Sequence, residues 1–310
     1  MVSSPPKRGF TMTATEIESI VQQGWSDHER DSPGVLERLG SALECIGSAA
    51  EIPPVAALLT HVAGEHLGRW DEGLTLLDRI AALPVHDPST PDGQALARSR
   101  AVLLLCSGRR SQALECIPDS PSARVRVLAV AGSALAGQRR AAEGIALFEE
   151  ALALATYGPD KNDPAARALA VTGNNLACAL EERPGRTKDE DRLLELASKT
   201  ARRYWELAGS WLEVERAEYR LAMTYVALGR GDAALEHARL CLAGCEANNA
   251  DASELFFARE ALLKAHQARG DMTKARAERG HMAELQAKLD PSLESLVKET
   301  LQKVDRLLPA

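Results

Sequence analysis

The sequence LGRGDAALEHARLCL, residues 228–242, contains the pattern from which the architecture of this chain can be inferred. A glycine and an arginine precede a run rich in alanine and leucine, and the pattern returns at 67–77, 107–117 and 269–279. Glycine readily adopts the left-handed conformation that ends a helix, which residues with a Cβ resist. Alanine and leucine are strong helix formers. The recurrence therefore predicts a succession of helices, each ended by a glycine and followed closely by the next.

Six glycines follow a leucine- or alanine-rich segment in this way, and neighbouring members are 29 to 48 residues apart. They are Gly68, Gly108, Gly137, Gly185, Gly229 and Gly270. This spacing scatters around the length of one helix–turn–helix unit. Each glycine is expected to end the first helix of a unit, and small residues are expected to let the two helices of the unit pack closely.

The composition supports an all-helical fold and argues against several classes of protein. Of the 310 residues 45% are apolar and only 4% aromatic, and long alternations of valine, isoleucine and threonine, which would indicate strands, are missing. A formal net charge of −7 argues against general nucleic-acid binding, which usually needs a basic face. No run of 18 or more apolar residues occurs, so neither a membrane span nor a membrane partner is expected.

The cysteines and the N-terminal residues favour a cytoplasmic location. The N-terminal stretch has a basic pair without a following apolar region, so it does not read as a secretory signal. We expect residues 1–12 to form a disordered leader, and Met12 is an alternative start to Met1. The cysteines lack the spacing of a disulfide framework, which favours a reducing compartment. They are Cys45, Cys106, Cys116, Cys178, Cys241 and Cys245.

Two stretches, 215–248 and 125–158, resemble tetratricopeptide repeats, a family of helix–turn–helix units with a degenerate pattern of small and large residues. The matching residues of the first stretch are Leu221, Ala222, Tyr225, Gly229, Ala234 and Ala238. Those of the second are Ala131, Gly132, Leu135, Gly144, Phe148, Ala151 and Leu152. Partial matches occur at 54–84, 94–121, 170–209 and 256–289, so the resemblance covers about three-quarters of the chain.

The resemblance implies an all-α, right-handed α-solenoid of about six helix pairs over residues 54–289. Flanking helices are expected at both ends, over 13–53 as an N-terminal helical cap and over 290–310 as a C-terminal capping helix with one charged face. The loop at 157–164, rich in proline, glycine and aspartate, is a candidate hinge. In such a solenoid the first helices of the pairs line a concave groove that suits an extended peptide or a partner's helix.

Asn174 and Asn175 are the most suggestive groove residues. By resemblance, Asn175 matches the asparagine that in related peptide-binding repeats precedes the Leu-small pair, here Leu176-Ala177, and hydrogen-bonds the ligand backbone. An amide donates and accepts at once, so it can bind a peptide unit without regard to sequence. The alternative is that the two asparagines bond only to a neighbouring helix or loop.

Five cations fall on expected first helices near the groove, and together they would favour a partner that carries carboxylates. They are Arg98, Arg126, Arg216, Arg220 and Lys264. The alternative is that they are solvated or paired with glutamates of their own helix, such as Arg216 with Glu213 or Arg220 with Glu218. The full two-carboxylate clamp of chaperone-binding members of the family is not recognisable.

Three further motifs have alternative interpretations as functional sites, and no metal or other cofactor is expected. HVAGEH at 61–66 has neither spacing of the known metalloprotease helices, although His61 and Glu65 would share a face and His86 could be imagined as a third ligand. We interpret Cys241 and Cys245 as small apolar packing residues. The charged turn GRTKDEDR at 185–192 is expected to be a solvated loop, with partner docking as the alternative.

The sequence therefore favours a non-catalytic scaffold or adaptor that binds a protein or peptide. No phosphate-binding loop or nucleophile elbow is present, and no cluster of acids and bases stands out. Two alternatives remain open: a peptide-sensing regulatory receptor, and a regulatory subunit that holds or inhibits a separate enzyme such as a protease or nuclease. An enzyme on a helical scaffold is the least favoured interpretation.

Overall fold

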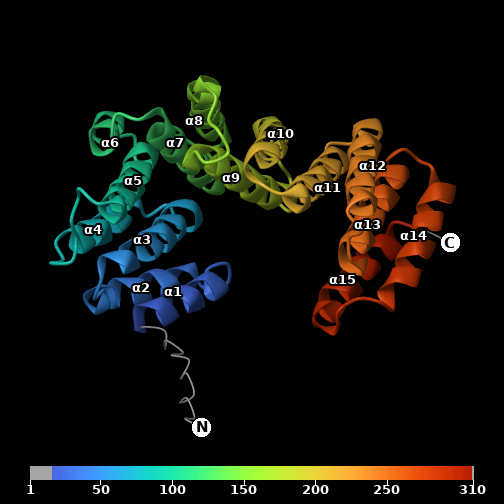
Figure 1. The fold of residues 1–310 in the computed structure, drawn as a ribbon, viewed down its shortest axis with the longest axis horizontal. Coiled ribbons are helices and arrows are strands. Elements are labelled where there is room, and N and C mark those ends of the chain that lie inside the picture. Colours follow the sequence, from blue (N-terminus) through green and yellow to red (C-terminus); the bar gives the residue numbers. More distant parts are fainter. Residues whose placement is uncertain (1–15, 309–310) are drawn as a thin grey trace, which may run out of the picture. The chain divides into compact units, whose positions relative to one another are not determined.

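The computed structural model describes residues 16–308. Within them the chain forms fifteen α-helices, joined by turns and short 3₁₀ or π segments, and no strand (Figure 1). The all-α prediction is thus confirmed for this part of the chain. The leader predicted at 1–12 and the alternative start at Met12 lie outside the described residues.

The chain divides into two compact units, one up to Pro118 and one from Asp119 onward. The helices of the first unit are α1 (Glu16–Asp27), α2 (Ser32–Ser41), α3 (Ile52–Thr60), α4 (Trp70–Ala81), α5 (Pro91–Cys106) and α6 (Arg110–Cys116). Three short segments accompany them: the 3₁₀ turns η1 (Leu43–Cys45) and η2 (Ala49–Glu51), and the π-helical turn η3 (His61–His66). The expected N-terminal cap is therefore helical, and α3 with η3 begins the first of the predicted pairs.

The second unit contains nine of the helices. They are α7 (Pro121–Gly137), α8 (Ala141–Leu154), α9 (Pro164–Glu181), α10 (Lys188–Ala208), α11 (Trp211–Ala227), α12 (Gly231–Ala247), α13 (Ala252–Ala268), α14 (Met272–Gln286) and α15 (Glu294–Arg306). Two 3₁₀ turns, η4 (Ala155–Tyr157) and η5 (Pro291–Leu293), precede α9 and α15. The predicted hinge loop lies inside this unit, after α8, and remains a prediction.

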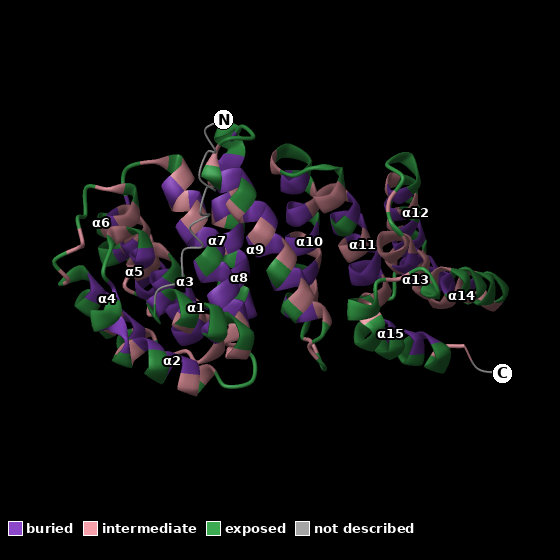
Figure 2. Cartoon of the chain, turned by 60° about the horizontal axis from the view of Figure 1, so that its bottom comes forward, coloured by how far each residue is buried: buried purple, intermediate pink, exposed green. Residues whose placement is uncertain are grey.

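Helices pack in sequential, adjacent pairs, so the chain builds each unit by local contacts. In the second unit the pairs are α7–α8, α9–α10, α11–α12 and α13–α14, and the first helices α7, α9, α11 and α13 also contact one another in order. Buried residues lie on the faces between neighbouring helices (Figure 2). This arrangement places side chains from several first helices close together.

Two apolar clusters close the C-terminal part of the second unit. Leu221, Tyr225 and Leu235 pack with residues of α13 between α11 and α12. Phe256 and Met282 pack with the inward face of α15, where the buried residues are Val297, Leu301 and Val304. The predicted C-terminal helix thus covers the last pair with its apolar side.

The helix-ending glycines adopt the left-handed conformation at five of the six predicted positions, with φ between +62° and +80°. Gly137 is the exception, because it is the last residue of α7 itself. Arg139, two residues later, takes the left-handed conformation there with φ of 58°. The prediction for Gly137 was therefore wrong: the turn is made, but by a residue that carries a Cβ.

Arg139→Gly is expected to raise the free energy of unfolding by about 0.5–1 kcal/mol. A left-handed residue with a Cβ costs about 1–2 kcal/mol, and the greater freedom of glycine in the unfolded chain offsets part of the gain. The ion pair that Arg139 forms with Glu190 at 3.8 Å contributes little, since the arginine side chain is 61% exposed. Urea denaturation measures the change. Gly229→Ala, at a position with φ of 68°, should change stability in the opposite direction, and a less stable Arg139→Gly variant would contradict this account.

Glycine also lets paired helices approach closely at two crossings. A Cβ added at Gly144 would lie 2.8 Å from the carbonyl oxygen of Gly132, across the α7–α8 contact. A Cβ added at Gly173 would lie 2.7 Å from the carbonyl oxygen of Ala197, across the α9–α10 contact. These crossings confirm that small residues allow the pairs to pack closely.

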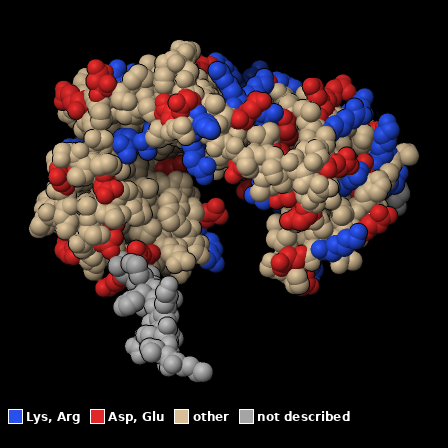
Figure 3. Space-filling model, viewed as in Figure 1, with Lys and Arg blue, Asp and Glu red and all other residues tan. Residues whose placement is uncertain are grey.

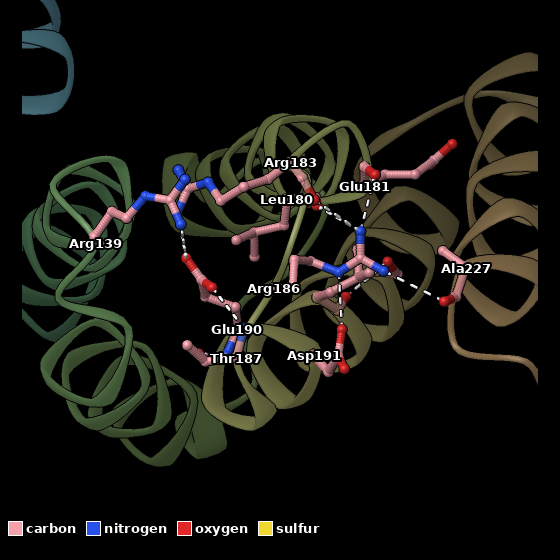
Figure 4. Close-up of polar contacts among 11 residues, drawn as sticks. Arg139, Leu180, Glu181, Arg183, Arg186, Thr187, Glu190, Asp191 and Ala227 are labelled. Carbon is pink, nitrogen blue, oxygen red and sulfur yellow. Dashed lines mark hydrogen bonds and ion pairs between the residues drawn. The ribbon is translucent and has the colours of Figure 1, made fainter.

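The charged turn between α9 and α10 is largely exposed, as expected, but Arg186 points inward and anchors it (Figure 4). Arg186 donates from Nη1 to the carbonyl oxygens of Leu180, Glu181 and Arg183, and from Nη2 to that of Ala227 at the end of α11. Its side chain is only 13% exposed. The expectation of a solvated loop was wrong for this arginine. Its Nη1 and Nη2 satisfy carbonyls near helix ends, where carbonyls lack helical partners, and its Nε donates to Asp191 at 2.8 Å.

Glu190 forms a second anchor in the same turn (Figure 4). It completes a capping box with Thr187, and its Oε1 accepts a hydrogen bond of 2.7 Å from Nη1 of Arg183. The same nitrogen of Arg183 donates to the carbonyl oxygen of Ala136 in α7 at 2.9 Å. The turn therefore ties α10 to both α7 and α9 through buried charges.

Candidate functional site

A cavity of about 510 Å³ in the second unit is lined mainly by residues of three first helices, α9, α11 and α13, with Trp205 of α10 and Leu293 of η5. We refer to it as the α9–α11–α13 pocket. Its apolar wall consists of Trp205, Tyr219, Phe257 and Leu293. Its polar wall consists of Asn174, Ser253, Arg216, Arg220, Glu213, Glu215 and Glu254. The pocket thus combines aromatic surface with an amide and charges of both signs.

Three of the residues predicted from sequence meet in this pocket. Asn174 comes from α9, and Arg216 and Arg220 come one turn apart from α11. Asn175 is exposed and is not among the lining residues, although its Oδ1 accepts a hydrogen bond of 3.3 Å from Nδ2 of Asn174. Between the two adjacent asparagines, the pocket therefore selects Asn174 and not the residue that the resemblance singled out.

The other three predicted cations lie elsewhere. Arg98 belongs to α5 of the first unit, and Arg126 lies half-buried on α7, where burial lowers its pKa against the opposing effect of Asp163. Lys264 forms an ion pair of 2.6 Å with Glu260, one turn earlier in α13. Glu260 also accepts a hydrogen bond of 3.0 Å from the hydroxyl of Tyr219, which lines the pocket. Lys264 itself does not line the pocket.

Both pocket arginines are paired with carboxylates from neighbouring helix pairs. Arg216 binds Glu254 of α13 through two nitrogens, and Arg220 binds Glu181 of α9. The two arginines are therefore paired with glutamates, as the alternative interpretation of the sequence expected. The partners are Glu254 and Glu181, and not Glu213 or Glu218. Over the second unit, basic and acidic side chains are intermixed on the face seen in Figure 3.

The two glutamates expected as partners have other roles. Glu213 forms the capping box of α11, in which its Oε2 accepts from the backbone nitrogen of Ser210 at 2.7 Å. Glu218 accepts hydrogen bonds from Arg202 and, at 2.7 Å, from Nδ1 of His237. Burial alone would raise the pKa of Glu218, but these two partners outweigh it and lower the pKa.

Glu215 is a buried carboxylate in the pocket wall with one unsatisfied oxygen. Its Oε1 accepts from the thiols of Cys241 at 2.7 Å and Cys245 at 3.4 Å, while its Oε2 has no partner in the described structure. Burial raises the pKa of Glu215. The Cys245 thiol and burial raise the pKa of Cys241, which keeps that thiol protonated as a donor. The two cysteines are buried as predicted, but they also hydrogen-bond, which sequence reasoning missed.

Arg220 adds an unsatisfied donor to the same wall. Its Nε is buried without a partner in the described structure, although Nη1 binds Glu181. Buried polar groups without partners cost stability and are rare in native structures. Glu215 and Arg220 thus each keep one buried polar atom without a partner in the described structure, at a cost in stability.

A second cluster of functional groups lies in the first unit. Nε2 of His61 and Nε2 of His66 are 3.0 Å apart at the two ends of η3, and the ring of His28 lies 5.0 Å from that of His61. His86 hydrogen-bonds the carbonyl oxygen of Ala81 at 3.0 Å and is not part of the cluster. Sequence reasoning missed His28, and it assumed α-helical winding for a segment that forms a π-turn.

Comparisons with protein families and with curated proteins identify no relative of this chain. No protein-family model matches it, and no curated protein matches it. Among the described residues, no helix has both the length and the apolar character needed to cross a membrane. The geometry of the sites is therefore the basis for a functional proposal.

Proposed function

We propose that this chain is a non-catalytic interaction scaffold of tetratricopeptide-like helix pairs, which binds a segment of a protein or peptide in the α9–α11–α13 pocket. One observation carries the proposal. Asn174, Arg216 and Arg220, chosen from sequence as residues of the first helices, line one pocket together with aromatic side chains. Stacked helical hairpins of this kind typically bind extended peptides or helices on the face formed by their first helices.

The chemistry of the pocket favours a polypeptide segment. Tyr219 and Phe257 offer apolar ring surface, and aromatic anchors contribute strongly to protein interfaces. The Asn174 amide can donate to a peptide carbonyl and accept from a peptide nitrogen. Glu215 and Arg220, each with one buried polar atom that lacks a partner in the described structure, also line the pocket.

Charge is proposed to select the partner through Arg216. Its side chain is 60% exposed, whereas that of Arg220 is 20% exposed. A carboxylate on the partner would share the Arg216 guanidinium with Glu254, and such contacts affect specificity and association rate more than affinity. Arg220 is held by Glu181 and is proposed to shape the pocket.

Asn174→Ala is expected to weaken peptide binding about tenfold, the effect of one hydrogen bond of ordinary net strength. Peptides for the measurement come from selection of a randomised display library against the immobilised protein. Asn175→Ala is the matched control, because it removes the same side chain one residue away, outside the pocket. It also removes the acceptor of the 3.3 Å hydrogen bond from Asn174, so its effect is expected to be smaller than that of Asn174→Ala and not zero. Fluorescence anisotropy with a selected peptide gives the affinities.

Each outcome of this experiment is informative. Weaker binding by Asn175→Ala with normal binding by Asn174→Ala would contradict the role of Asn174. It would support Asn175, the residue that the family resemblance indicates, as the peptide contact. Equal binding by both variants, or a library that yields no binders, would contradict the proposed function. Circular dichroism and thermal unfolding of both variants establish that their fold is unchanged.

A further inference from the structure

We propose that His28, His61 and His66 form a binding site for a single transition-metal ion of the zinc type. This site goes beyond the proposed function, because all three histidines belong to the first unit, whereas the α9–α11–α13 pocket belongs to the second. One ring nitrogen of each histidine lies within 4.8 Å of the others.

The π-turn η3 brings two of the ligands together. His61 and His66 are five residues apart, a spacing that puts side chains on different faces of an α-helix but on the same face of a π-helix, whose hydrogen bonds join residues i and i+5. Their Nε2 atoms are consequently 3.0 Å apart. Single π-turns inside helices occur frequently at functional sites.

His28 completes the cluster from the end of α1. It follows Asp27, the last residue of that helix, and its ring lies edge-on to that of His66 with 5.1 Å between the centroids. Nδ1 of His28 is 2.7 Å from the carbonyl oxygen of Trp25 and donates to it, which leaves Nε2 as the ligand nitrogen. The helix end and the π-turn thus present three imidazoles to one point.

The spacing of the nitrogens suits a tetrahedral zinc ion after a small movement. A Zn–N bond of 2.0–2.1 Å implies ligand nitrogens about 3.3 Å apart. The His61–His66 pair is already near that separation. The nitrogens of the cluster, all within 4.8 Å of one another, need to close by about 1.5 Å at most to reach that spacing. The three rings are only partly buried, which leaves room for an adjustment of this size.

Outer partners hold two of the rings in the orientation that a metal requires. Nδ1 of His61 lies 3.2 Å from Oε2 of Glu65, and Nδ1 of His28 bonds the Trp25 carbonyl. A metal-binding histidine almost always donates its other ring N–H to a carboxylate or a backbone carbonyl, which fixes the tautomer. Two ligands of this cluster have those two partners.

Packing alone explains less of the arrangement. A hydrogen bond between His61 and His66 needs only these two rings, yet a third imidazole and a carboxylate behind His61 are also present. The three histidines are only partly buried, which leaves a path for the ion.

The donor set selects the class of metal. Imidazole suits zinc, copper, nickel and related ions, whereas magnesium and calcium prefer oxygen ligands. Three protein ligands leave a fourth position for water or for a group of a partner, as in zinc sites that are not purely structural. The site would also join α1 to the α3–η3 segment.

Isothermal titration of the untagged full chain with Zn²⁺ tests the proposal. We expect one ion per chain, no comparable binding of Mg²⁺, and loss of this binding in His28→Gln, His61→Gln and His66→Gln. His86→Gln is the matched control and should bind as the unaltered protein does. Glu65→Gln is expected to weaken binding about 10–100-fold, the usual effect of removing an outer partner.

A spectroscopic measurement separates a lost site from a lost fold. Co²⁺ bound to the unaltered protein should give the visible absorption of a four-coordinate ion, absent from the three histidine variants, while their metal-free far-ultraviolet circular dichroism is unchanged. Zn²⁺ binding that survives in the histidine variants but disappears in Cys241→Ser would place the ion at the buried thiols and overturn the proposal. Absence of one-to-one binding would overturn it as well.

Discussion

Gly173→Ala is expected to lower the free energy of unfolding by about 3 kcal/mol, the upper end of the usual cost of overpacking a core. The added Cβ would lie 2.7 Å from the carbonyl oxygen of Ala197 and 3.0 Å from the backbone nitrogen of Ala201. Both atoms belong to the backbone of α10, so no side chain can move aside. The α9–α10 pair must separate, and its neighbours must adjust. Urea denaturation followed by circular dichroism measures the loss.

Gly280→Ala is the matched control for this prediction. Gly280 lies exposed on α14, and no heavy atom lies within 4 Å of a Cβ added there. The same substitution should therefore stabilise the protein by about 0.5–1 kcal/mol through helix propensity alone. Similar effects of the two substitutions would contradict the close approach of α9 and α10.

Glu190→Ala is expected to destabilise the protein by about 2 kcal/mol, because it leaves the buried guanidinium of Arg183 with an uncompensated charge. The side chains of Glu190 and Arg183 are 2% and 14% exposed, and the Ala136 carbonyl remains as an acceptor for Arg183. The variant also loses the capping box with Thr187. Asp189→Ala, which removes an exposed carboxylate from the same helical turn, controls for the interaction with the helix dipole.

The cost of Glu190→Ala should depend on pH. Burial alone would raise the pKa of Glu190, but the hydrogen bonds from Thr187 and Arg183 outweigh it and hold the pKa below its ordinary value of 4.5. A carboxyl group with a lowered pKa stabilises the folded state above its unfolded pKa, and this contribution is lost as pH falls through the folded pKa. The difference in stability between the two proteins should therefore shrink below about pH 4.5. A difference that stays constant down to pH 2.5 would contradict the role of the charge.

The helical pairs could be predicted because their signals are local. Gly229 ends α11 and alanine- and leucine-rich residues follow at once, so propensity and turn chemistry agree. The α7–α8 turn could not be predicted in detail, because the left-handed residue must lie just beyond the helix. Gly137 is still helical, and Arg139 occupies that position instead.

The pocket could be predicted only to within one residue. Asn174 and Asn175 point about 100° apart around α9, and the periodicity of that helix does not decide which one faces the neighbouring pairs. The partners of the arginines were also hidden, because Glu181 and Glu254 are 39 and 38 residues away from Arg220 and Arg216. The rules that predict ion pairs within one helix cannot predict pairs between different helices.

The histidine cluster could not be predicted from the sequence, because residues 61–66 were assumed to follow the α-helical period and form a π-turn instead. A search at α-helical spacing pairs His61 with Glu65 and separates it from His66, and His28 lies on another helix end. Only the π-turn makes five residues equivalent to one turn. The spacing of HVAGEH differs from that of the metalloprotease helices, and that difference has no bearing on the geometry of this cluster.

A π-turn contains one residue more than the regular turn that it replaces. Deleting a single residue within 61–66 would restore uniform winding and improve the backbone hydrogen bonds, while rotating one imidazole away from the other. A segment with one residue fewer would form a regular helix without the three-histidine cluster, and the segment present here forms the cluster at the cost of regular geometry. Among homologous chains, the length of this segment, and not only its residues, would distinguish those able to hold the ion.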